Sequence, residues 1–319
     1  MTRKLGKLPA QPGRPQLRLA DYTSTIPSPP TSVTWFDLVR QWPMFLNDQL
    51  GDCVEAAMGH AVEQITMYGQ GQLVTVSDSD IQASYTSITG YDPSDPSTDQ
   101  GTYMQDAMAW WRKTGLISHK IEAYASVTPS NLNLLKNCVN FFGSVPIGFN
   151  FPSSAMDQFD DGEPWDVVDG AALEGGHCVL VVGYDTDFLY VVTWGRVQKM
   201  TWRFYQKYTD EVWVVIDDEM VNKLTHASGF GGAIDLHTMG EDFSSLTGKA
   251  NPFPDVDPTP APVPAPPPTP TPVPVVDEKG AGDALWHDIR HWAVQEHHTG
   301  DNKRAATSSR NWARLTGRR

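Results

Sequence analysis

One cysteine stands where its thiol could act as a nucleophile. Cys53 follows the turn Gly51-Asp52, and Asp52 is of a residue type that commonly caps a helix N-terminus. Apolar residues then recur at helical spacing: Val54, Met58, Ala61 and Ile65. In the first turn of a helix, unpaired N–H groups and the helix dipole stabilise a thiolate, so we expect a lowered pKa for Cys53. The alternative is that Cys53 is a small buried residue without a chemical role.

A histidine far along the chain could serve as the base for this thiol. His177 stands near the start of an apolar run, Gly175 to Asp185, which an Asp-Thr-Asp turn joins to a second run, Phe188 to Gly195. Two β-branched runs around a short turn predict a hairpin, with His177 at the start of its first strand. A histidine at a strand end is commonly structural, so the chemical interpretation depends on Cys53 and His177 together.

These segments resemble the papain-like cysteine peptidases. In that family the catalytic Cys opens a central helix, and the His opens a strand that leads into a hairpin ending in Asn-Ser-Trp-Gly; here the hairpin ends in Trp194-Gly195. Residues 101–116 are similar to the family's Gly-rich loop and second helix, and the resemblance covers roughly residues 33–216. It implies an α+β fold of two lobes, one helical and one of antiparallel β-strands, with the active site in the cleft between them.

The sequence also departs from the family around these residues. Residues 50–54, Leu-Gly-Asp-Cys-Val, stand where the family has Cys-Gly-Ser-Cys-Trp, so the neighbouring disulfide cysteine is absent. Asn47 stands where the family has a Gln that helps to form the oxyanion hole. The Asn of Asn-Ser-Trp-Gly is missing, and Val192 or Thr193 occupies its place. This variant is similar to that of uncharacterised bacterial and bacteriophage proteins.

The resemblance implies a cysteine peptidase that cleaves peptide or amide bonds. Cys53 would be the nucleophile and His177 would take its proton, forming a thiolate–imidazolium pair. Asn47 and the backbone N–H of Cys53 would hold the oxyanion, and Thr193 would orient the imidazole through its hydroxyl. We expect a peptide or protein substrate and neither a cofactor nor a metal.

Two other functions remain open. A binding or structural protein, for example a bacteriophage virion component, could keep the papain-like fold with a weak or inactive site. Alternatively, the Cys-His pair could act on a non-peptide amide or as a transferase, because the chemistry of the thiol would be the same.

Composition indicates a folded body with a sizeable core. The chain has 319 residues, of which 40% are hydrophobic, and its net charge of −14 argues against nucleic acid as the main partner. The charge is −16 over residues 1–276 and +2 over residues 277–319, which suggests two parts with separate roles. Three cysteines make no disulfide framework, and we expect Cys138 and Cys178 to be core residues.

The chain divides by composition into four parts. Residues 1–30 are basic and Pro-rich, and we expect an irregular arm that packs along the domain surface; residues 31–248 form the papain-like domain. Residues 249–276 form a linker, because 12 prolines between Asn251 and Val276 favour a polyproline II spacer. Residues 277–319 form a helical tail.

The tail has an apolar stripe that a single helix cannot bury alone. Leu285, Ile289 and Trp292 lie on one side of the predicted helix Ala281 to His298, so we expect it to dock on a protein partner or a larger assembly. His287 and His291 have a metal-compatible spacing, but no third ligand is evident and we expect no metal there.

The start of the chain carries no apolar segment typical of a signal peptide, and no run is long enough to span a bilayer. We therefore expect synthesis in a reducing cytoplasm and no membrane partner, with association with a virion as a further possibility.

The remaining patterns predict the elements around the site. Helices are expected over residues 77–89, 103–114, 130–142 and 200–208, and strands over 145–151 and 212–216. The loop Pro152 to Glu174 is rich in Asp and Glu and should rim the cleft. It is either a solvated acidic loop or a rim that favours basic substrates.

Overall fold

The computed structural model describes residues 3–11, 13–23 and 28–217, together with residues 237, 241, 242, 244, 250 and 251. The predicted linker and helical tail therefore lie almost entirely outside the described residues. Within the described part, no helix is both long and apolar enough to cross a bilayer.

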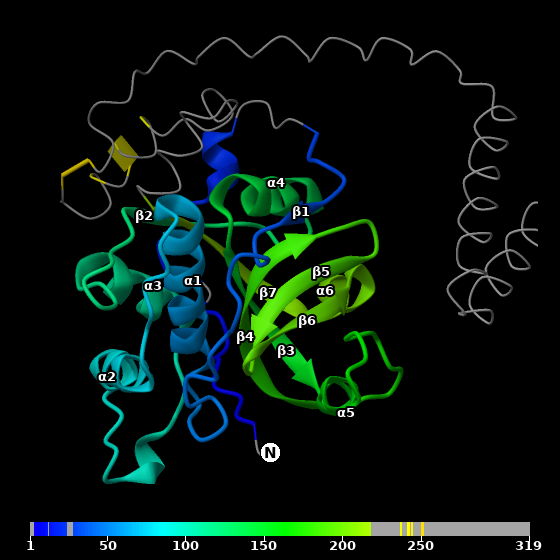
Figure 1. Cartoon of the computed structure of the whole chain (residues 1–319), viewed down its shortest axis with the longest axis horizontal. Coiled ribbons are helices and arrows are strands. Elements are labelled where there is room, and N and C mark those ends of the chain that lie inside the picture. Colours follow the sequence, from blue (N-terminus) through cyan, green and yellow to red (C-terminus); the bar gives the residue numbers. More distant parts are fainter. Residues whose placement is uncertain are drawn as a thin grey trace, which may run out of the picture. The chain divides into compact units, whose positions relative to one another are not determined.

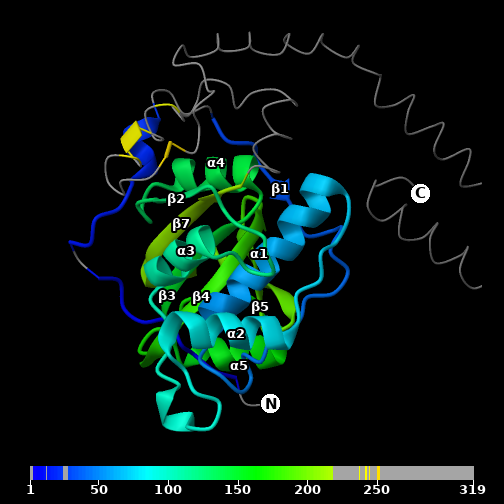
Figure 2. The ribbon, with the colours of Figure 1, turned by 90° about the vertical axis from the view of Figure 1, so that its left-hand side faces the viewer.

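Three helices form the first lobe: α1 (Cys53–Gln70), α2 (Asp78–Thr89) and α3 (Met104–Lys113). Helix α1 ends at Gly71, whose left-handed backbone lets its N–H reach the carbonyl of Met67. Helix α2 begins with a capping box in which Ser77 and Asp80 accept each other's backbone N–H groups. Helix α1 lies between this lobe and the sheet (Figures 1 and 2).

The second lobe is an antiparallel sheet with helices packed on it. Its strands are β1 (Val33–Thr34), β2 (Ala123–Ser126), β3 (Val145–Pro152), β4 (Leu173–Tyr184), β5 (Phe188–Thr193), β6 (Arg196–Thr201) and β7 (Thr209–Ile216). They run in the order β2-β7-β3-β4-β5-β6, and β1 pairs with β4. The helices of this lobe are α4 (Leu132–Phe142), α5 (Ser154–Asp161) and α6 (Trp202–Tyr208).

Strand β4 separates two hydrophobic cores. Cys178, Leu180 and Val182 face the core that contains α1, whereas Val179 and Val181 face the core of the sheet lobe. This alternation follows from the two-residue period of a strand. A register shift opposite β5 between Val181 and Gly183 then changes the phase, and Tyr184 joins the sheet-lobe core.

The predicted fold class, a two-lobed α+β fold, is confirmed by this architecture. The helices expected over residues 77–89, 103–114 and 130–142 are present with boundaries shifted by at most two residues. The expected helix over 200–208 begins only at Trp202, because residues 196–201 form β6.

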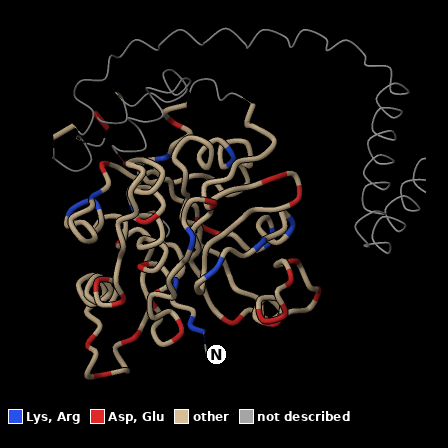
Figure 3. The backbone as a smooth tube through the Cα atoms, viewed as in Figure 1, with Lys and Arg blue, Asp and Glu red and all other residues tan. Residues whose placement is uncertain are grey.

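Several elements were absent from the prediction, among them α5, β1, β2 and β6. The acidic loop 152–174 contains α5, whose inward residues Ala155 and Phe159 lie four apart and whose C-cap is Gly162. Strand β2 is short and pairs with β7, so its stability depends on a partner distant in sequence. Acidic residues are spread over both lobes (Figure 3).

The N-terminal arm corrects one expectation. It contains a 3₁₀ turn, η1 (Leu19–Tyr22), and within residues 4–8 Lys4 is exposed, Leu5, Gly6 and Leu8 are half-buried and Lys7 is buried. They run between the two lobes, and Lys7 is only 4% exposed. Pro-rich composition predicted the irregular backbone but not this burial.

Candidate active site

Cys53 lies at the start of α1, where the two lobes meet. It is 1% exposed, and its Sγ accepts the backbone N–H of Cys178 at 3.4 Å. Cys178 is the neighbour of His177 on β4, so the structure places the two predicted residues at adjacent positions. All three cysteines are free, and Cys138 and Cys178 are buried as expected.

The turn before Cys53 is held by Asn47. Its Nδ2 donates to the carbonyl of Leu50 at 3.0 Å and to Oδ1 of Asp52 at 3.1 Å, so both amide hydrogens are used within the turn. Asp52 occupies the N-cap position, but its side chain caps no helix N–H, unlike the prediction. Asn47 thus supports the turn that carries Cys53.

His177 is oriented by Thr193 from the neighbouring strand β5. Its Nε2 lies 2.8 Å from the hydroxyl Oγ1 of Thr193, and both residues are buried. Nδ1 of His177 has no hydrogen-bond partner within the described part of the chain. One ring nitrogen is therefore held by the hydroxyl, and the other is left for a second group.

Trp194 covers the imidazole. The two rings stack with centroids 4.4 Å apart and an interplanar angle of 20°. Trp194 and Gly195 form the two-residue turn between β5 and β6, with φ angles of 44° and 81°. Such turns require positive φ at both positions, which is unusual for a bulky residue such as Trp. The turn therefore holds Trp194 against His177 at a conformational cost.

An apolar environment keeps His177 neutral. Phe149, Phe151 and Trp165 lie edge-on to its ring. Burial lowers the pKa of His177 to about 3, because a charged imidazolium would lose its hydration.

The thiol of Cys53 is also neutral in this structure. Its pKa is raised to about 12, mainly by burial and also by Glu55 and Asp52, and the N–H groups of Cys178 and Gly6 offset part of this rise. The expected lowering by the helix N-terminus is therefore wrong for this state, because loss of hydration exceeds the stabilisation from N–H groups. A thiolate–imidazolium pair can form only when water or a substrate reaches the sulfur of Cys53 in place of the protein groups that now bury it.

Two buried carboxyl groups, those of Asp52 and Glu55, adjoin the turn that carries Cys53; Asp52 was predicted only as an N-cap, and Glu55 was not predicted to have a role. Glu55 is fully buried, and its Oε1 accepts the hydroxyl of Thr102 at 2.8 Å. Burial raises the pKa of Glu55 to about 8 and that of Asp52 well above its usual range, the latter also through repulsion by Glu55. The spacing of Asp52 and Glu55, one turn apart at a helix start, was a usable signal.

The Glu55→Gln variant tests the raised pKa of Glu55 through the pH dependence of the free energy of unfolding. Because the pKa of Glu55 in the folded protein, about 8, exceeds its ordinary value of 4.5, the native state favours the protonated acid. Its stabilising contribution is complete below pH 4.5 and is lost as the pH rises through 8. Glu55→Gln should thus be nearly neutral at pH 4.5 and stabilising by a few kcal/mol at pH 9, at about 1.4 kcal/mol per pKa unit.

Urea denaturation at the two pH values measures this difference. Glu241→Gln, at an exposed carboxylate, is the matched control and should change little at either pH. A Glu55→Gln variant that is equally destabilised at both pH values would contradict the assignment.

The segment Lys4–Leu8 of the arm lies across the site. Lys4 N–H donates to the carbonyl of Asn47 at 2.9 Å, and Gly6 approaches so closely that a Cβ there would lie 1.8 Å from the carbonyl oxygen of Gly51. Only glycine fits at this position. The segment therefore covers the turn that carries Cys53, and the N–H of Gly6 is close enough to the thiol to lower its pKa.

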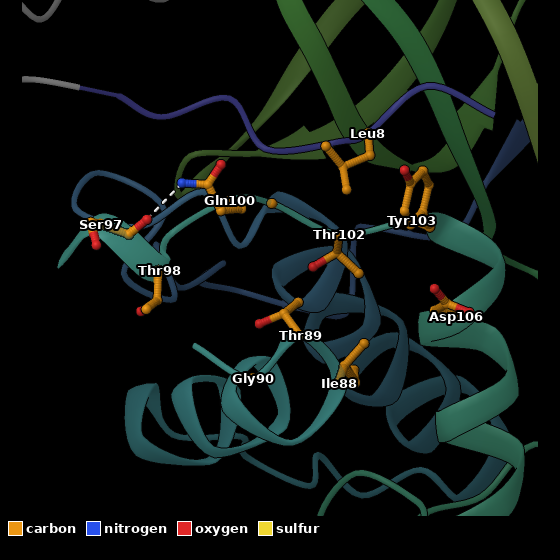
Figure 4. Close-up of a pocket in the computed structure, with 11 residues that line it drawn as sticks. Leu8, Ile88, Thr89, Gly90, Ser97, Thr98, Gln100, Thr102, Tyr103 and Asp106 are labelled. Carbon is orange, nitrogen blue, oxygen red and sulfur yellow. Dashed lines mark hydrogen bonds between the residues drawn. The ribbon is translucent and has the colours of Figure 1, made fainter. Parts of the chain in front are cut away.

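A cavity of about 570 Å³ lies beside this segment, beyond Leu8 (Figure 4). It is lined by the end of α2, residues 97, 98 and 100–103, and Asp106 of α3, and Gln100 donates to the carbonyl of Ser97 at 2.6 Å across its rim. Neither Cys53 nor His177 lines this cavity. Within the described residues, no group of three or more His, Cys, Asp or Glu side chains could hold a metal ion.

Comparisons with known proteins agree with this geometry at the level of fold. No family model matches the chain, and no curated protein matches it. Xylellain, a cysteine protease from Xylella fastidiosa, has a similar structure, with a TM-score of 0.53 and 18% identity over 68% of this chain and 98% of that protein. The chain therefore has the fold of the papain-like cysteine proteases.

Two further solved structures show weaker similarity. The cysteine protease CMS1MS2 of Carica candamarcensis gives a TM-score of 0.43 and 15% identity, covering 59% of this chain and 99% of that one. The ragweed cysteine protease Amb a 11, in its proform, gives 0.46 and 17%, covering 61% of this chain and 67% of that one.

Proposed function

We propose that the chain is a cysteine peptidase with Cys53 as nucleophile and His177 as base. The observation that carries the proposal is the arrangement where the two lobes meet. The thiol of Cys53, at a helix N-terminus, accepts the N–H of Cys178, the residue after His177, and Nε2 of His177 is held by the hydroxyl of Thr193. A thiol, an oriented imidazole and a shielding indole are the components of nucleophilic acyl transfer.

The reaction follows from these groups once the sulfur is uncovered. The sulfur of Cys53 attacks the peptide carbonyl carbon while its proton passes to Nδ1 of His177. The C–N bond then breaks, the imidazolium protonates the leaving amine, and a thioester remains on Cys53. Water, deprotonated by His177, hydrolyses the thioester and regenerates the thiol. Thr193 keeps Nδ1 directed at the reacting atoms by holding Nε2.

The oxyanion would be held mainly by backbone N–H groups, including that of Cys53. Asn47 could donate only by releasing Leu50 or Asp52, because both its amide hydrogens are engaged in the turn. Loss of one oxyanion donor costs about 10²–10³ in rate, so the expected turnover is slower than that of a complete site.

Cleavage of an unfolded protein by the full-length chain tests the proposal. Reduced, carboxymethylated substrate should yield new N-termini, detected by mass spectrometry, and Cys53→Ala should yield none. Cys138→Ala, which removes a buried thiol of the sheet-lobe core, should retain cleavage. Equal cleavage by Cys53→Ala and the parent chain would refute the proposal.

The second candidate is a papain-fold binding protein without turnover. It is favoured by the covered sulfur and by the neutral states of Cys53 and His177 in this structure. It predicts no cleavage even when the arm is displaced, whereas a peptidase gains activity under that condition.

A further inference from the structure

The arm buries one lysine against two acidic residues, Asp210 and Glu211, of which Asp210 itself remains exposed. Nζ of Lys7 lies 2.8 Å from each carboxylate oxygen of Asp210 and 3.6 Å from Oε2 of Glu211, and its side chain is 1% exposed. Lysine is almost never fully buried unless it is paired. We call the site formed by Met104, Gly148, Asp210 and Glu211 the Lys7 pocket.

The pocket is shaped for a long cationic side chain. Gly148 pairs with Glu211 across β3 and β7, and a Cβ at Gly148 would lie 2.3 Å from Cε of Lys7 and 2.7 Å from Sδ of Met104. Oε1 of Glu211 accepts the indole N–H of Trp213 at 2.8 Å, which fixes this carboxylate and leaves its other oxygen towards Lys7. The absence of a side chain on β3 thus makes room for the alkyl stem.

The backbone of the arm binds as a peptide strand would. Gly6 and Lys7 donate to the carbonyl of Gly176 at 3.2 and 3.1 Å, and Leu8 donates to that of Thr102 at 2.9 Å. Thr102 in turn donates to the carbonyl of Gly6 at 2.8 Å. These contacts use main-chain atoms and are independent of sequence, so selection rests on side chains that enter pockets.

The Lys7 pocket lies close to the thiol, because Gly6, the residue before Lys7, lies against Gly51 in the turn that carries Cys53, and its N–H lowers the pKa of Cys53. A peptide that follows the same path would present its own side chain to Asp210 and Glu211 while its backbone crosses the sulfur.

We propose that the Lys7 pocket is a specificity pocket that takes a Lys or Arg side chain of a peptide, and that Lys7 occupies it in place of that peptide. The pairing of two carboxylates with one cation favours a basic side chain, and an apolar side chain of the same length would leave both carboxylates uncompensated. That this peptide is a substrate rests on the proposed function; that the pocket binds a basic side chain does not.

Protection of Cys53 against alkylation tests the pocket without requiring turnover. The full-length Lys7→Ala chain is labelled with iodoacetamide, and modification of Cys53 is followed by mass mapping. The probe is the acetylated peptide amide Arg-Lys-Leu-Gly-Lys-Leu-Pro-Ala, the sequence of residues 3–10, and its analogue has norleucine in place of the second lysine. The lysine peptide should protect at concentrations at least about 30-fold lower than the analogue.

Matched variants separate the pocket from a general effect of charge. Lys4→Ala removes an exposed lysine three residues away and should leave Cys53 as slow to label as in the parent chain, whereas Lys7→Arg should keep the arm in place. Adding Asp210→Asn and Glu211→Gln to Lys7→Ala should abolish the difference between the two peptides. The two peptides are also compared in Gly6→Ala, where the clash of the added Cβ with the backbone of Gly51 displaces the arm, so that this variant provides a second chain with an open site.

The outcomes distinguish the pocket from the proposed function. Equal protection by the two peptides in both open chains would overturn the pocket, even if unfolded protein is cleaved. Selective protection without any cleavage would overturn the peptidase and leave the pocket as a binding site for basic peptides.

Discussion

Substituting Gly6 with Ala should raise the rate at which iodoacetamide alkylates Cys53 at pH 7.5 by on the order of 10³-fold. The added Cβ would lie 1.8 Å from the carbonyl oxygen of Gly51, a backbone atom, so the arm must leave the sulfur. Burial now raises the pKa of Cys53 to about 12. A solvated thiol has a pKa of about 8.5, and a helix N-terminus lowers it further.

Mass mapping after brief labelling measures this effect, and the other two cysteines report on the fold. Cys138 and Cys178 should remain protected in Gly6→Ala, because they lie in the cores. Gly13→Ala is the control, since nothing lies within 4 Å of a Cβ added there and the strain at its positive φ of 79° falls outside residues 4–8. Equal labelling of Cys53 in Gly6→Ala and the parent chain would mean that the arm does not cover the sulfur.

Replacing His177 with Ala in the opened Gly6→Ala chain should lower kcat/KM for peptide cleavage by about 10²–10⁴-fold, the usual contribution of a general base. The selectivity of alkylation for Cys53 should also fall, since the imidazole no longer stabilises the thiolate. The measurement is a kinetic assay of a Lys-containing fluorogenic peptide.

Thr193 supplies graded variants for the same assay. Thr193→Val removes the hydroxyl that lies 2.8 Å from Nε2 and should lower turnover less than loss of the imidazole does. Thr193→Asn should preserve or raise turnover, because its amide replaces the hydroxyl as hydrogen-bond partner. If Thr193→Val is as active as the parent while His177→Ala is inactive, another group orients the imidazole.

Local patterns were sufficient to predict the elements that carry the site. The turn before Cys53 and the hairpin after His177 follow from spacing within short segments. Thr193 was indicated by the resemblance to the papain-like peptidases, as one of two alternatives with Val192, and its contact with His177 is present. The side-chain role of Asn47 could not be predicted, because its partners depend on the conformation of the turn.

Neither the position of the arm nor the pKa of the Cys53 thiol could be predicted from the sequence, and the reasons differ. Lys7 and Asp210 are 203 residues apart, and neither lies in a periodic pattern that would indicate a contact. The thiol's pKa depends on hydration, which changes when a distant segment covers the sulfur. A helix N-terminus alone therefore predicts the wrong direction.

The position of residues 4–8 has a consequence for how the protein responds to concentration. A ligand that belongs to the same chain is present at an effective concentration on the order of millimolar, whatever the amount of protein. A peptide must compete with this internal ligand. Its apparent affinity is therefore its intrinsic affinity multiplied by the fraction of chains in which the arm has left the site. Dilution cannot release the arm, and occupancy of the site is set by the concentration of the competing peptide and not by that of the protein.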